Sequence, residues 1–523
     1  MRYRLGIDVG GTNTDAVILD ENRRVVAKAK TPVTDDVISG IVQVVSRVIR
    51  EAGIDPSQIT HAMLGTTQVT NAIIERRGLL PVGILRLGSP ATHAIRPLAA
   101  WPEDLRRAVE GPVAIVPGGV EYDGRPISAF DAEAVRRFAE QAMEAGIRAF
   151  AVTAVFSPVR NDDERRAAEI IASVAGSEAT ISLSYEIGSV GLLERENATV
   201  LNAAVSDVAR RVARAFADAM ARLDIRAELF LSQNDGTLMS LDYAQRYPIL
   251  TVACGPTNSI RGAGFLSGRE DAVVIDVGGT STDVGVLVGG FPRESAVAVE
   301  IGGVRTNFRM PDLISIGLGG GSVVRWPADR TGGNEVQIGP DSVGSKVVER
   351  ALCFGGDVLT MTDVAVARGM AALGDRGRIQ VPAEVIEAAY RRAVAMVEEA
   401  VDRIKTRAGD VPAILVGGGS ILLPDRLEGV SVVERPDHYE VANAVGAAIA
   451  QVSGTVDRIY SLDNRSRESV LAEAREAAYA EAVQAGADPD TVEVIEVEEV
   501  PLAYLPGNAV RVKVKAAGQL RSA

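Results

Sequence analysis

The sequence predicts an α/β protein made of two similar halves. Residues 7–15 read Ile-Asp-Val-Gly-Gly-Thr-Asn-Thr-Asp, and residues 275–283 repeat this stretch with one change, Ser281 in the place of Asn13. Apolar residues lead into both copies and leave both copies, which is the pattern of a strand, a tight Gly-Gly turn and a returning strand. Elsewhere strands alternate with amphipathic helices, the order typical of α/β domains. We therefore expect two related domains, each headed by such a hairpin.

Length and composition indicate several folded domains. A chain of 523 residues is too long for one hydrophobic core. Its 47% apolar and 24% charged residues are typical of a folded protein in water. The repeat, together with a change of composition near residue 455, predicts three regions: residues 1–190, residues 191–453, and a small α/β region at residues 454–523.

Charge and cysteine content exclude several classes of partner. The net charge of −14 and a pI near 5.0 argue against nucleic acid and against an anionic membrane surface. No apolar run reaches the ~18 residues that cross a bilayer, and the first residues enter a strand with no signal-peptide core, so we expect a cytoplasmic protein. Only two cysteines and three histidines are present, and none are paired at ligand spacing. A Cys/His zinc site is therefore not expected.

The hydrophobic pattern places further elements between the glycine turns. Helices are predicted at residues 37–52, 72–77, 131–145, 162–175, 194–223, 383–406, 441–450 and 467–486. Strands are predicted at residues 24–28, 61–64, 149–156, 227–232, 413–416, 491–498 and 508–515. The helix at 441–450 consists almost wholly of small residues, so we expect it to pack closely beside the cleft.

The two hairpins carry the residues expected to bind phosphate. Glycine without a Cβ atom lets backbone N–H groups approach a phosphate, and neighbouring threonines add hydroxyl donors. A carboxylate at the end of each first strand can hold Mg²⁺ or take a proton from a nucleophile, and the carboxylate that closes each hairpin is within reach of the same ion. The candidate phosphate ligands are Gly10, Gly11, Thr12, Thr14, Gly278, Gly279, Thr280 and Thr282. The candidate catalytic carboxylates are Asp8, Asp15, Asp276 and Asp283, with Asp8 and Asp276 as the metal ligands.

Two further strand ends carry candidate binding residues. Thr66 and Thr67 follow a glycine at a predicted strand end, with Asn71 four residues after Thr67; this is either an anion or carbonyl site or an ordinary threonine-capped helix start. Near the start of the helix predicted at 194–223, Arg195, Asn197 and Thr199 either face a ligand or form ordinary helix surface. After the strand at 413–416, a run of glycines would let a flat ring lie against the backbone. That run comprises Gly417, Gly418 and Gly419, followed by Ser420.

These motifs resemble the phosphate-1, phosphate-2, adenosine and connecting motifs of the actin/hexokinase/Hsp70 superfamily. As a set they are most similar to the hydantoinase A / 5-oxoprolinase family, which is related to acetone carboxylase subunits. The resemblance covers roughly residues 3–450 and is carried by both hairpins, by residues 65–71 and 317–322, and by Gly339-Pro340-Asp341-Ser342 and Thr362-Asp363. The chain departs from the family at Asn161-Asp162-Asp163-Glu164 and Cys254-Gly255-Pro256-Thr257, and it is a short form with its own C-terminal tail.

The resemblance implies duplicated ribonuclease-H-like, actin-like ATPase domains around an ATP cleft, with ATP and Mg²⁺ bound there. It implies ATP-driven opening of a cyclic amide such as a hydantoin, 5-oxoproline or a lactam. The Gly/Thr turns would hold the phosphates, residues 417–420 would flank adenosine, and Thr66, Thr67 and Asn71 would face the substrate. A second hydantoinase subunit is a possible partner, and the chain is a possible homo-oligomer.

Three other functions fit the same motifs. A small-molecule kinase of this fold would transfer phosphate to a stable product, with Asp276 deprotonating an alcohol. A non-catalytic ATPase switch would bind and release nucleotide without a small substrate. An ATP-dependent carboxylase subunit would activate a ketone as an enol phosphate and would require bicarbonate or partner chains.

Overall fold

The computed structural model describes residues 2–34, 36–295, 299–308, 310–326, 336–463, 465–503 and 508–521. Both predicted hairpins are present, and each heads a sheet with the same strand order. In the first sheet the order is β3-β2-β1-β4-β9. In the second sheet the order is β12-β11-β19-β20, where β12 and β11 correspond to β2 and β1, and β13 and β16 both pair with β12. In each, the hairpin partners are antiparallel and the next strand is parallel. The predicted duplication is therefore confirmed.

The strands of the two sheets are bounded as follows. The first contains β1 (Tyr3–Val9), β2 (Asn13–Leu19), β3 (Val25–Pro32), β4 (Ile59–Thr66), β9 (Glu228–Ser232) and β10 (Leu238–Ser240). The second contains β11 (Ala272–Val277), β12 (Thr282–Val288), β13 (Phe291–Pro292), β16 (Leu313–Ile316), β19 (Val411–Val416) and β20 (Val430–Glu434). Two short hairpins lie outside both sheets, β14 (Val299–Ile301) with β15 (Val304–Thr306), and β17 (Ser322–Arg325) with β18 (Gln337–Ser342).

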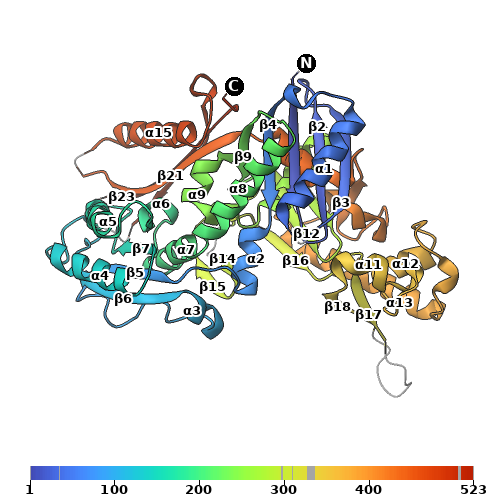
Figure 1. Ribbon diagram of the computed structural model, residues 1–523, viewed down its shortest axis with the longest axis horizontal. Coiled ribbons are helices and arrows are strands. Elements are labelled where there is room, and N and C mark those ends of the chain that lie inside the picture. The colour runs from blue at the N-terminus through green and yellow to red at the C-terminus, as the bar shows by residue number, and fades with distance from the viewer. Residues whose placement is uncertain are drawn as a thin grey trace.

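A separate parallel sheet is inserted after β4. Its order is β6-β5-β7-β8, and helices α4 and α5 pack against it on the left of Figure 1. The strands are β5 (Val82–Ser89), β6 (Glu110–Pro117), β7 (Ala149–Ala154) and β8 (Thr180–Leu183). The helices of this part are α3 (Glu103–Val109), α4 (Ala132–Glu144), α5 (Asp162–Ala175) and α6 (Ser184–Ile187).

The prediction of a single helix at residues 194–223 is wrong. The chain forms α7 (Leu192–Ala204) and α8 (Ser206–Arg222), which meet at Val205. Helix α7 packs on β7 of the inserted sheet, whereas α8 packs on α1 (Val37–Ala52) beside the first sheet. One straight helix could not cover both surfaces, and tertiary packing therefore overrides the continuous helical pattern.

One more helix begins earlier than the sequence predicted. Helix α2 (Gln68–Glu75) starts directly after Thr67 rather than at residue 72, and a further helix, α10 (Cys254–Ser267), starts at Cys254. The remaining long helices are α13 (Ala383–Ile404), α14 (Ala442–Ile449) and α15 (Arg467–Gln484), with shorter α9 (Leu241–Arg246), α11 (Val347–Arg350) and α12 (Met361–Ala367). Among the described helices, none is both long and apolar enough to cross a bilayer.

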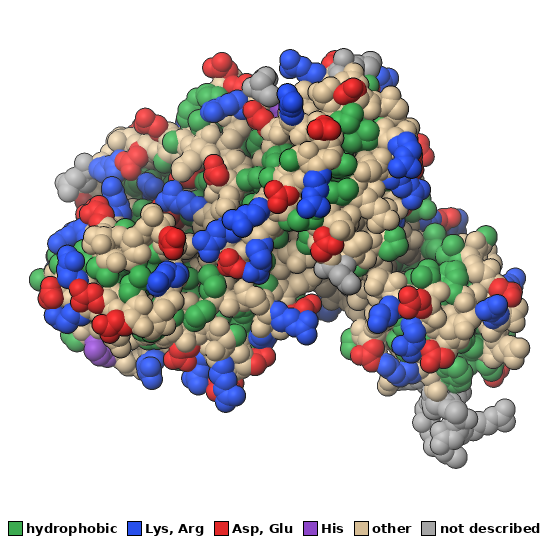
Figure 2. Space-filling model, viewed as in Figure 1, with side chains coloured by type: hydrophobic (Ala, Val, Ile, Leu, Met, Phe, Trp, Pro, Cys, Tyr) green, Lys and Arg blue, Asp and Glu red, His purple; other side chains and the backbone are tan. Residues whose placement is uncertain are grey.

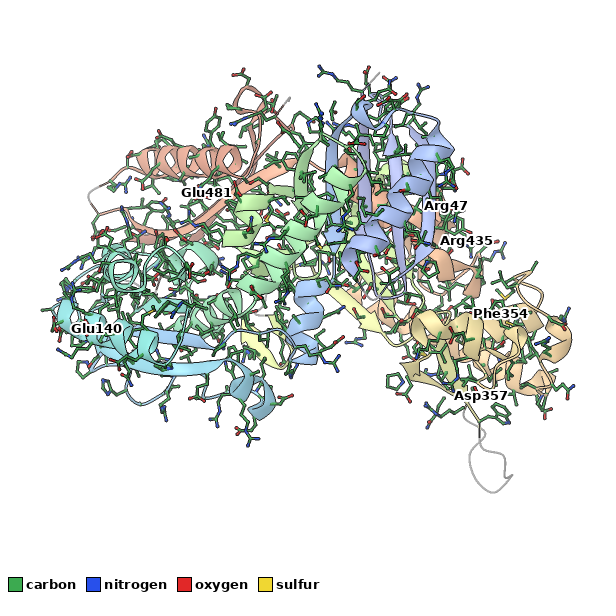
Figure 3. The ribbon with its side chains drawn as sticks, in the orientation of Figure 1. Arg47, Glu140, Phe354, Asp357, Arg435 and Glu481 are labelled. Atoms are coloured by element: carbon green, nitrogen blue, oxygen red, sulfur yellow. The ribbon has the colours of Figure 1, made fainter. Side chains whose placement is uncertain are left out.

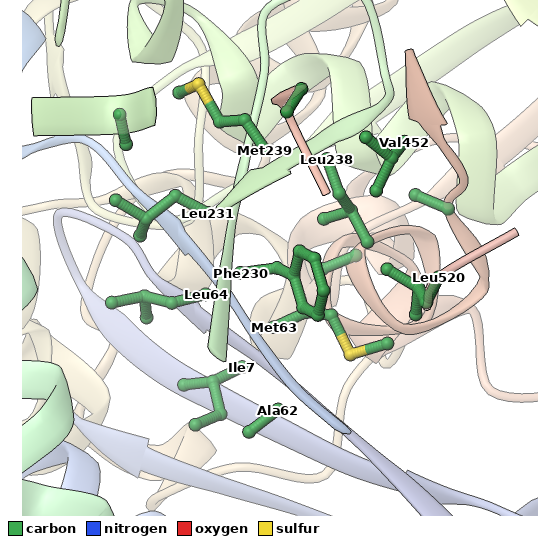
Figure 4. Packing of buried hydrophobic residues seen from close by; sticks show 14 of the residues in the cluster. Ile7, Ala62, Met63, Leu64, Phe230, Leu231, Leu238, Met239, Val452 and Leu520 are labelled. Carbon is green, nitrogen blue, oxygen red and sulfur yellow. The ribbon is translucent and has the colours of Figure 1, made fainter. Parts of the chain in front are cut away.

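The C-terminal region has the predicted α/β content and is attached to the first sheet. Strand β21 (Val452–Ser461) pairs with β10, and β23 (Ala509–Gly518) and β22 (Glu493–Pro501) extend the sheet beyond it, with α15 packed on β21 and β23. Figure 4 shows side chains from β1, β4, β9, β10 and β21 meeting in one core, including Ile7, Phe230 and Val452. The division at residues 190 and 453 stays a prediction.

The predicted close packing of the small-residue helix is present. Helix α14 lies between β1 and α10, and contacts both. A Cβ atom at Gly446 would overlap the carbonyl oxygen of Asn258 on α10, and one at Gly262 would overlap that of Ala442. A Cβ atom at Gly6 on β1 would overlap the carbonyl oxygen of Ala444. Glycine at these positions lets α14 join the first sheet to the second half.

Replacing Gly446 by alanine tests this packing. In an unobstructed helix interior, glycine to alanine stabilises by about 1 kcal/mol. Here we expect Gly446→Ala to lower the free energy of unfolding by about 1–3 kcal/mol, because the added carbon overpacks the contact with α10. Denaturant unfolding measures the change. The matched control is Gly255→Ala on α10, whose Cβ would lie 3.8 Å from Thr67, an ordinary contact. Equal or greater stability of Gly446→Ala would contradict the packing.

Candidate active site

The turns of the two hairpins face each other. In each turn the first glycine donates its backbone N–H across the loop, Gly10 to the carbonyl of Asn13 at 3.0 Å and Gly278 to that of Ser281 at 2.9 Å. The hydroxyl oxygens of Thr12 and Thr280 lie 3.4 Å apart. Residues 268 positions apart in sequence therefore stand side by side, and the two turns form opposite walls of one site.

A cavity of about 630 Å³ lies between these walls. Besides the hairpins it is bordered by the start of α2, the start of α10, the glycine turn after β19, and the start of α14. Most of the predicted site residues line it. They are Asp8, Gly10, Gly11, Thr12, Asp15, Thr67, Asn71, Asp276, Gly278, Gly279, Thr280, Asp283, Gly417 and Gly418.

Five predicted site residues lie behind the cavity wall. Thr14 and Thr282 are buried on the returning strands, and the Thr282 hydroxyl donates to the carbonyl of Leu318 at 2.6 Å. Thr66 is buried, and its hydroxyl accepts the backbone N–H of Gln68 at 3.2 Å, at the start of α2. Gly419 packs against the second hairpin, where a Cβ atom would lie 2.6 Å from the carbonyl oxygen of Gly278. Ser420 is buried in the short helical turn at Gly418–Leu422.

Arg195, Asn197 and Thr199 do not line the cavity. Arg195 is buried and donates to the carbonyl of Ala154 at 2.6 Å, and the Thr199 hydroxyl donates back to the carbonyl of Arg195 at 2.7 Å. The side-chain oxygen of Asn197 accepts from the indole N–H of Trp101 at 2.7 Å. These residues hold α7 against the inserted sheet.

Each hairpin brings its two carboxylates together. Strand pairing sets Asp8 opposite Asp15 and Asp276 opposite Asp283. One amide joins the first pair, because Nδ2 of Asn443 donates to Asp8 Oδ2 and to Asp15 Oδ2, both at 2.9 Å. Its Oδ1 accepts the backbone N–H of Ala444 at 2.8 Å, which fixes the orientation of the amide.

Lys30 supplies the positive charge at this pair. Its Nζ lies 2.9 Å from Asp15 Oδ1, and the two residues are paired in register between β2 and β3. Neither Lys30 nor Asn443 was among the predicted site residues. The register of the β2–β3 pair could have indicated Lys30. Asn443 could have been noticed only as a polar residue near the start of a helix that otherwise consists of small apolar residues.

Burial makes these carboxylates weaker acids. Burial, the charge of Asp15 and the charge of Asp276 raise the pKa of Asp8 to about 7, against opposing hydrogen bonds from amide groups. Burial also raises the pKa of Asp283 to about 6, with the Ser315 hydroxyl opposing it. The pKa values of Asp15 and Asp276 are raised by burial as well. A pKa near 7 means that Asp8 gains or loses a proton close to neutral pH, where a nearby cation would favour the charged form.

The cavity residues suit Mg²⁺ shared with phosphate. Asp8 Oδ1 is buried and has no hydrogen-bond partner among the described residues. No three His, Cys, Asp or Glu side chains in the described ranges are arranged to hold a metal alone. Mg²⁺ at phosphate sites is typically held by one or two carboxylates with phosphate oxygens and water completing the shell. The donor set fits that arrangement, with Asp8 and Asp276 as candidate ligands.

The fold and the opposed turns define the class of protein. Two duplicated α/β domains, each headed by a Gly-Gly-Thr hairpin and closing on one cavity, form an actin-like ATPase-type architecture. Residues 4–175 match the family model of the hydantoinase/oxoprolinase N-terminal region, and residues 195–370 match that of hydantoinase/oxoprolinase. The chain belongs to the hydantoinase/oxoprolinase family.

Relatives with curated names include enzyme subunits. The caprolactamase subunit alpha of Pseudomonas jessenii is 26% identical over 71% of this chain and 55% of its own length. The acetophenone carboxylase gamma subunit of Aromatoleum aromaticum is 26% identical over 70% of this chain and 53% of its own length. An uncharacterised protein of Methanocaldococcus jannaschii is 25% identical over 77% of this chain and 62% of its own length. The chain thus matches about half to three fifths of these relatives.

Solved structures share the fold. The ATP-dependent caprolactamase of Pseudomonas jessenii superposes with a TM-score of 0.76 at 20% identity, over 99% of this chain and 88% of that one. Nucleotide-free acetone carboxylase superposes with a TM-score of 0.70 at 17% identity, with the same coverage of each chain. The predicted fold class is confirmed.

The raised pKa of Asp8 predicts how pH affects stability. A carboxyl whose folded pKa is raised from 3.8 to about 7 binds a proton in the folded state that the unfolded state has released. Its contribution to the free energy of unfolding therefore falls, by on the order of 4 kcal/mol, as pH rises through that window. We expect Asp8→Asn, measured without Mg²⁺, to raise the thermal midpoint at pH 8 and to raise it less at pH 5. The control is Asp242→Asn, an exposed carboxylate on α9. A gain that does not grow with pH would contradict the assignment.

Proposed function

We propose that the chain is the ATP-using part of an enzyme that activates a carbonyl compound, and that its substrate is a cyclic amide. The observation that carries this proposal is the pair of opposed Gly-Gly-Thr turns, with buried carboxylates on the strands that flank each turn. Membership of the hydantoinase/oxoprolinase family and the similarity to a caprolactamase subunit support the substrate class.

The turns would hold the phosphates of ATP. Gly11, Thr12, Gly279 and Thr280 line the cavity from both sides, and their N–H and hydroxyl groups offer fixed donors where negative charge develops. Gly417 has a φ of 84°, and Gly418 beside it lines the same cavity. These glycines would leave room for the adenosine.

The carboxylates would hold Mg²⁺ and take part in proton transfer. Mg²⁺ would neutralise charge on the phosphate oxygens during transfer. Asp8 and Asp276 would be its ligands, while Asn443 and Lys30 hold Asp8 and Asp15 in place. A carboxyl with a pKa near 7, such as Asp8, is matched to proton transfer at neutral pH.

The start of α2 would face the substrate. Thr67 and Asn71 line the cavity one turn apart, and Nδ2 of Asn71 donates to the Thr67 hydroxyl at 3.3 Å. Thr67 follows β4, whose Gly65 is paired in register with Asp8. An amide carbonyl is a poor electrophile because of resonance. Transfer of the γ-phosphoryl group of ATP to this oxygen would release ADP and make the carbonyl carbon a better electrophile. Water would then add to that carbon, and the C–N bond would break with a proton going to the nitrogen. A second water would hydrolyse the resulting acyl phosphate, giving phosphate and an amino acid.

A second subunit would complete the reaction. Relatives in the family are named as alpha, beta and gamma subunits. The chain matches only part of their length, so the partner, the intact activity and the state of assembly are proposals.

A carboxylase subunit is the second candidate. The acetophenone and acetone carboxylase relatives favour it. In that reaction the same site would phosphorylate a ketone in its enol form, and bicarbonate would be required. Both candidates share phosphorylation of a carbonyl oxygen at the cavity and differ in what attacks next.

Phosphate release separates the candidates. The purified chain, alone and with co-purified partners, is incubated with ATP, Mg²⁺ and either hydantoins, 5-oxoproline or larger lactams, or a ketone with bicarbonate. We expect a cyclic amide to stimulate phosphate release and to gain the mass of one water. Stimulation only by a ketone with bicarbonate, and a mass gain of carbon dioxide, would establish the carboxylase. Stable phosphorylated product would instead establish a kinase.

Asp276→Asn tests the role of the second hairpin. We expect this variant to lose turnover by about 10²–10⁴-fold while keeping most of its nucleotide affinity, because the Gly and Thr donors remain. Phosphate release and calorimetric titration with an ATP analogue measure the two effects. Asp242→Asn again serves as the control. Unchanged turnover would remove Asp276 from the mechanism.

A further inference from the structure

A second cavity, of about 540 Å³, lies away from the hairpins. It is lined by α6 of the inserted part, by α9, by β21 and by the C-terminal end of α15, and we call it the α9–α15 cavity. Figure 1 shows α15 above and α5 and α6 below this part of the molecule. Segments that are distant in sequence therefore build this cavity. The proposed reaction does not use it.

Most charged groups of this cavity are neutralised by the protein. Glu186 accepts from Nη2 of Arg246 at 2.6 Å and from the Tyr247 hydroxyl at 3.0 Å. Asp235 lies 2.8 Å from Nζ of Lys515. Asp457 is paired with Arg511 on β23. The Glu186–Arg246 pair joins α6 to α9, and the other two pairs join cavity residues to β23.

Glu481 forms no ion pair with a described residue. Its carboxylate accepts the Tyr243 hydroxyl at 3.2 Å, and no Lys or Arg among the described residues lies within ion-pair distance of it. Burial raises the pKa of Glu481, as does the charge of Glu186, whereas the Tyr243 hydrogen bond and the more distant charges of Arg246 and Arg458 oppose the rise. Figure 3 labels Glu481 on the side of α15 that faces β21. A half-buried carboxylate with one neutral donor is an incomplete site for a positive group.

Two arginines at the same cavity form no ion pair with a described carboxylate. Arg165 on α5 and Arg458 on β21 line it, and neither forms an ion pair with another residue in the described ranges. Figure 2 shows Lys and Arg side chains gathered over this region, between α15 and α5. The cavity therefore presents one carboxylate and two guanidinium groups that form no ion pair among the described residues. The Tyr243 and Tyr247 rings, with centroids 4.7 Å apart, line the same cavity and offer an aromatic wall.

We propose that the α9–α15 cavity binds a small zwitterionic amino acid, with its ammonium group at Glu481 and its carboxylate at Arg165 and Arg458. The ammonium completes the charge of Glu481, and guanidinium groups are suited to a carboxylate. The carbon chain of the ligand lies along the tyrosine rings. Opening of a lactam yields an amino acid of this class, so the ligand would be the reaction product; that link alone rests on the proposed function.

Calorimetric titration of the full chain tests the site without any turnover. The probes are 6-aminohexanoate and alanine, one long and one short zwitterion, with hexanoate and hexylamine as single-charge controls. We expect saturable binding of at least one zwitterion at millimolar concentration or below, and at least about tenfold weaker binding of both single-charge probes. Equal binding of hexanoate and the zwitterion would overturn the proposal, as would no binding of either zwitterion.

Variants locate the binding. Glu481→Gln and Arg165→Gln should each weaken the zwitterion by about tenfold or more. The matched control is Glu476→Gln on the exposed face of α15, which should bind normally. Because the Arg165 side chain is exposed, Arg165→Gln remains informative if Glu481→Gln folds poorly. Binding that both variants retain would place the zwitterion elsewhere and overturn the proposal. Loss of lactam hydrolysis with this binding intact would contradict only the proposed function.

Discussion

The structure depends on the contact of α14 with both halves of the molecule. Glycines at Gly6, Gly262 and Gly446 let the backbones of β1, α10 and α14 approach where side chains would collide. The same helix carries Asn443 into the cavity, where its amide spans Asp8 and Asp15. Because the helix follows the second sheet and presses on the first, any shift between the halves would move the amide relative to the carboxylates. Packing and site geometry are thus set by one element.

Electrostatics explain why such an arrangement suits phosphoryl chemistry. Four aspartates are held in a partly desolvated space that contains one paired lysine, Lys30. Such a cluster is unfavourable by itself, as the raised pKa values of Asp8 and Asp283 show. A divalent cation bound with phosphate would relieve the repulsion, so nucleotide and metal would bind most tightly together. Large clusters of buried apolar residues in both sheets contribute the stability that offsets this cost.

The sequence was sufficient for the duplication, both hairpins and most cavity residues, because local strand and turn patterns carry that information. It was insufficient wherever long-range packing decides. The break at Val205 follows from two different packing partners, which no local pattern records. Asn443 donates a hydrogen bond to Asp8, which lies 435 positions away in the sequence. Strand β21 joins the first sheet by pairing with β10, a strand that is also distant from it in sequence. Thr14, Thr282 and Ser420 were assigned by motif position, yet all three are buried, the two threonines by strand alternation and Ser420 in the helical turn after β19.

Both proposed functions require the same first step. A lactam and an enolisable ketone each present a carbonyl oxygen that could accept a phosphoryl group. In the proposal this step would be served by the paired turns and carboxylates, which are nearly identical in the two hairpins. Selectivity would then come from other residues that line the cavity, among them the apolar side chains of Ile74, Val299, Met310 and Leu313. An apolar lining favours an uncharged hydrocarbon compound over a charged one, a requirement that a lactam and an apolar ketone both meet.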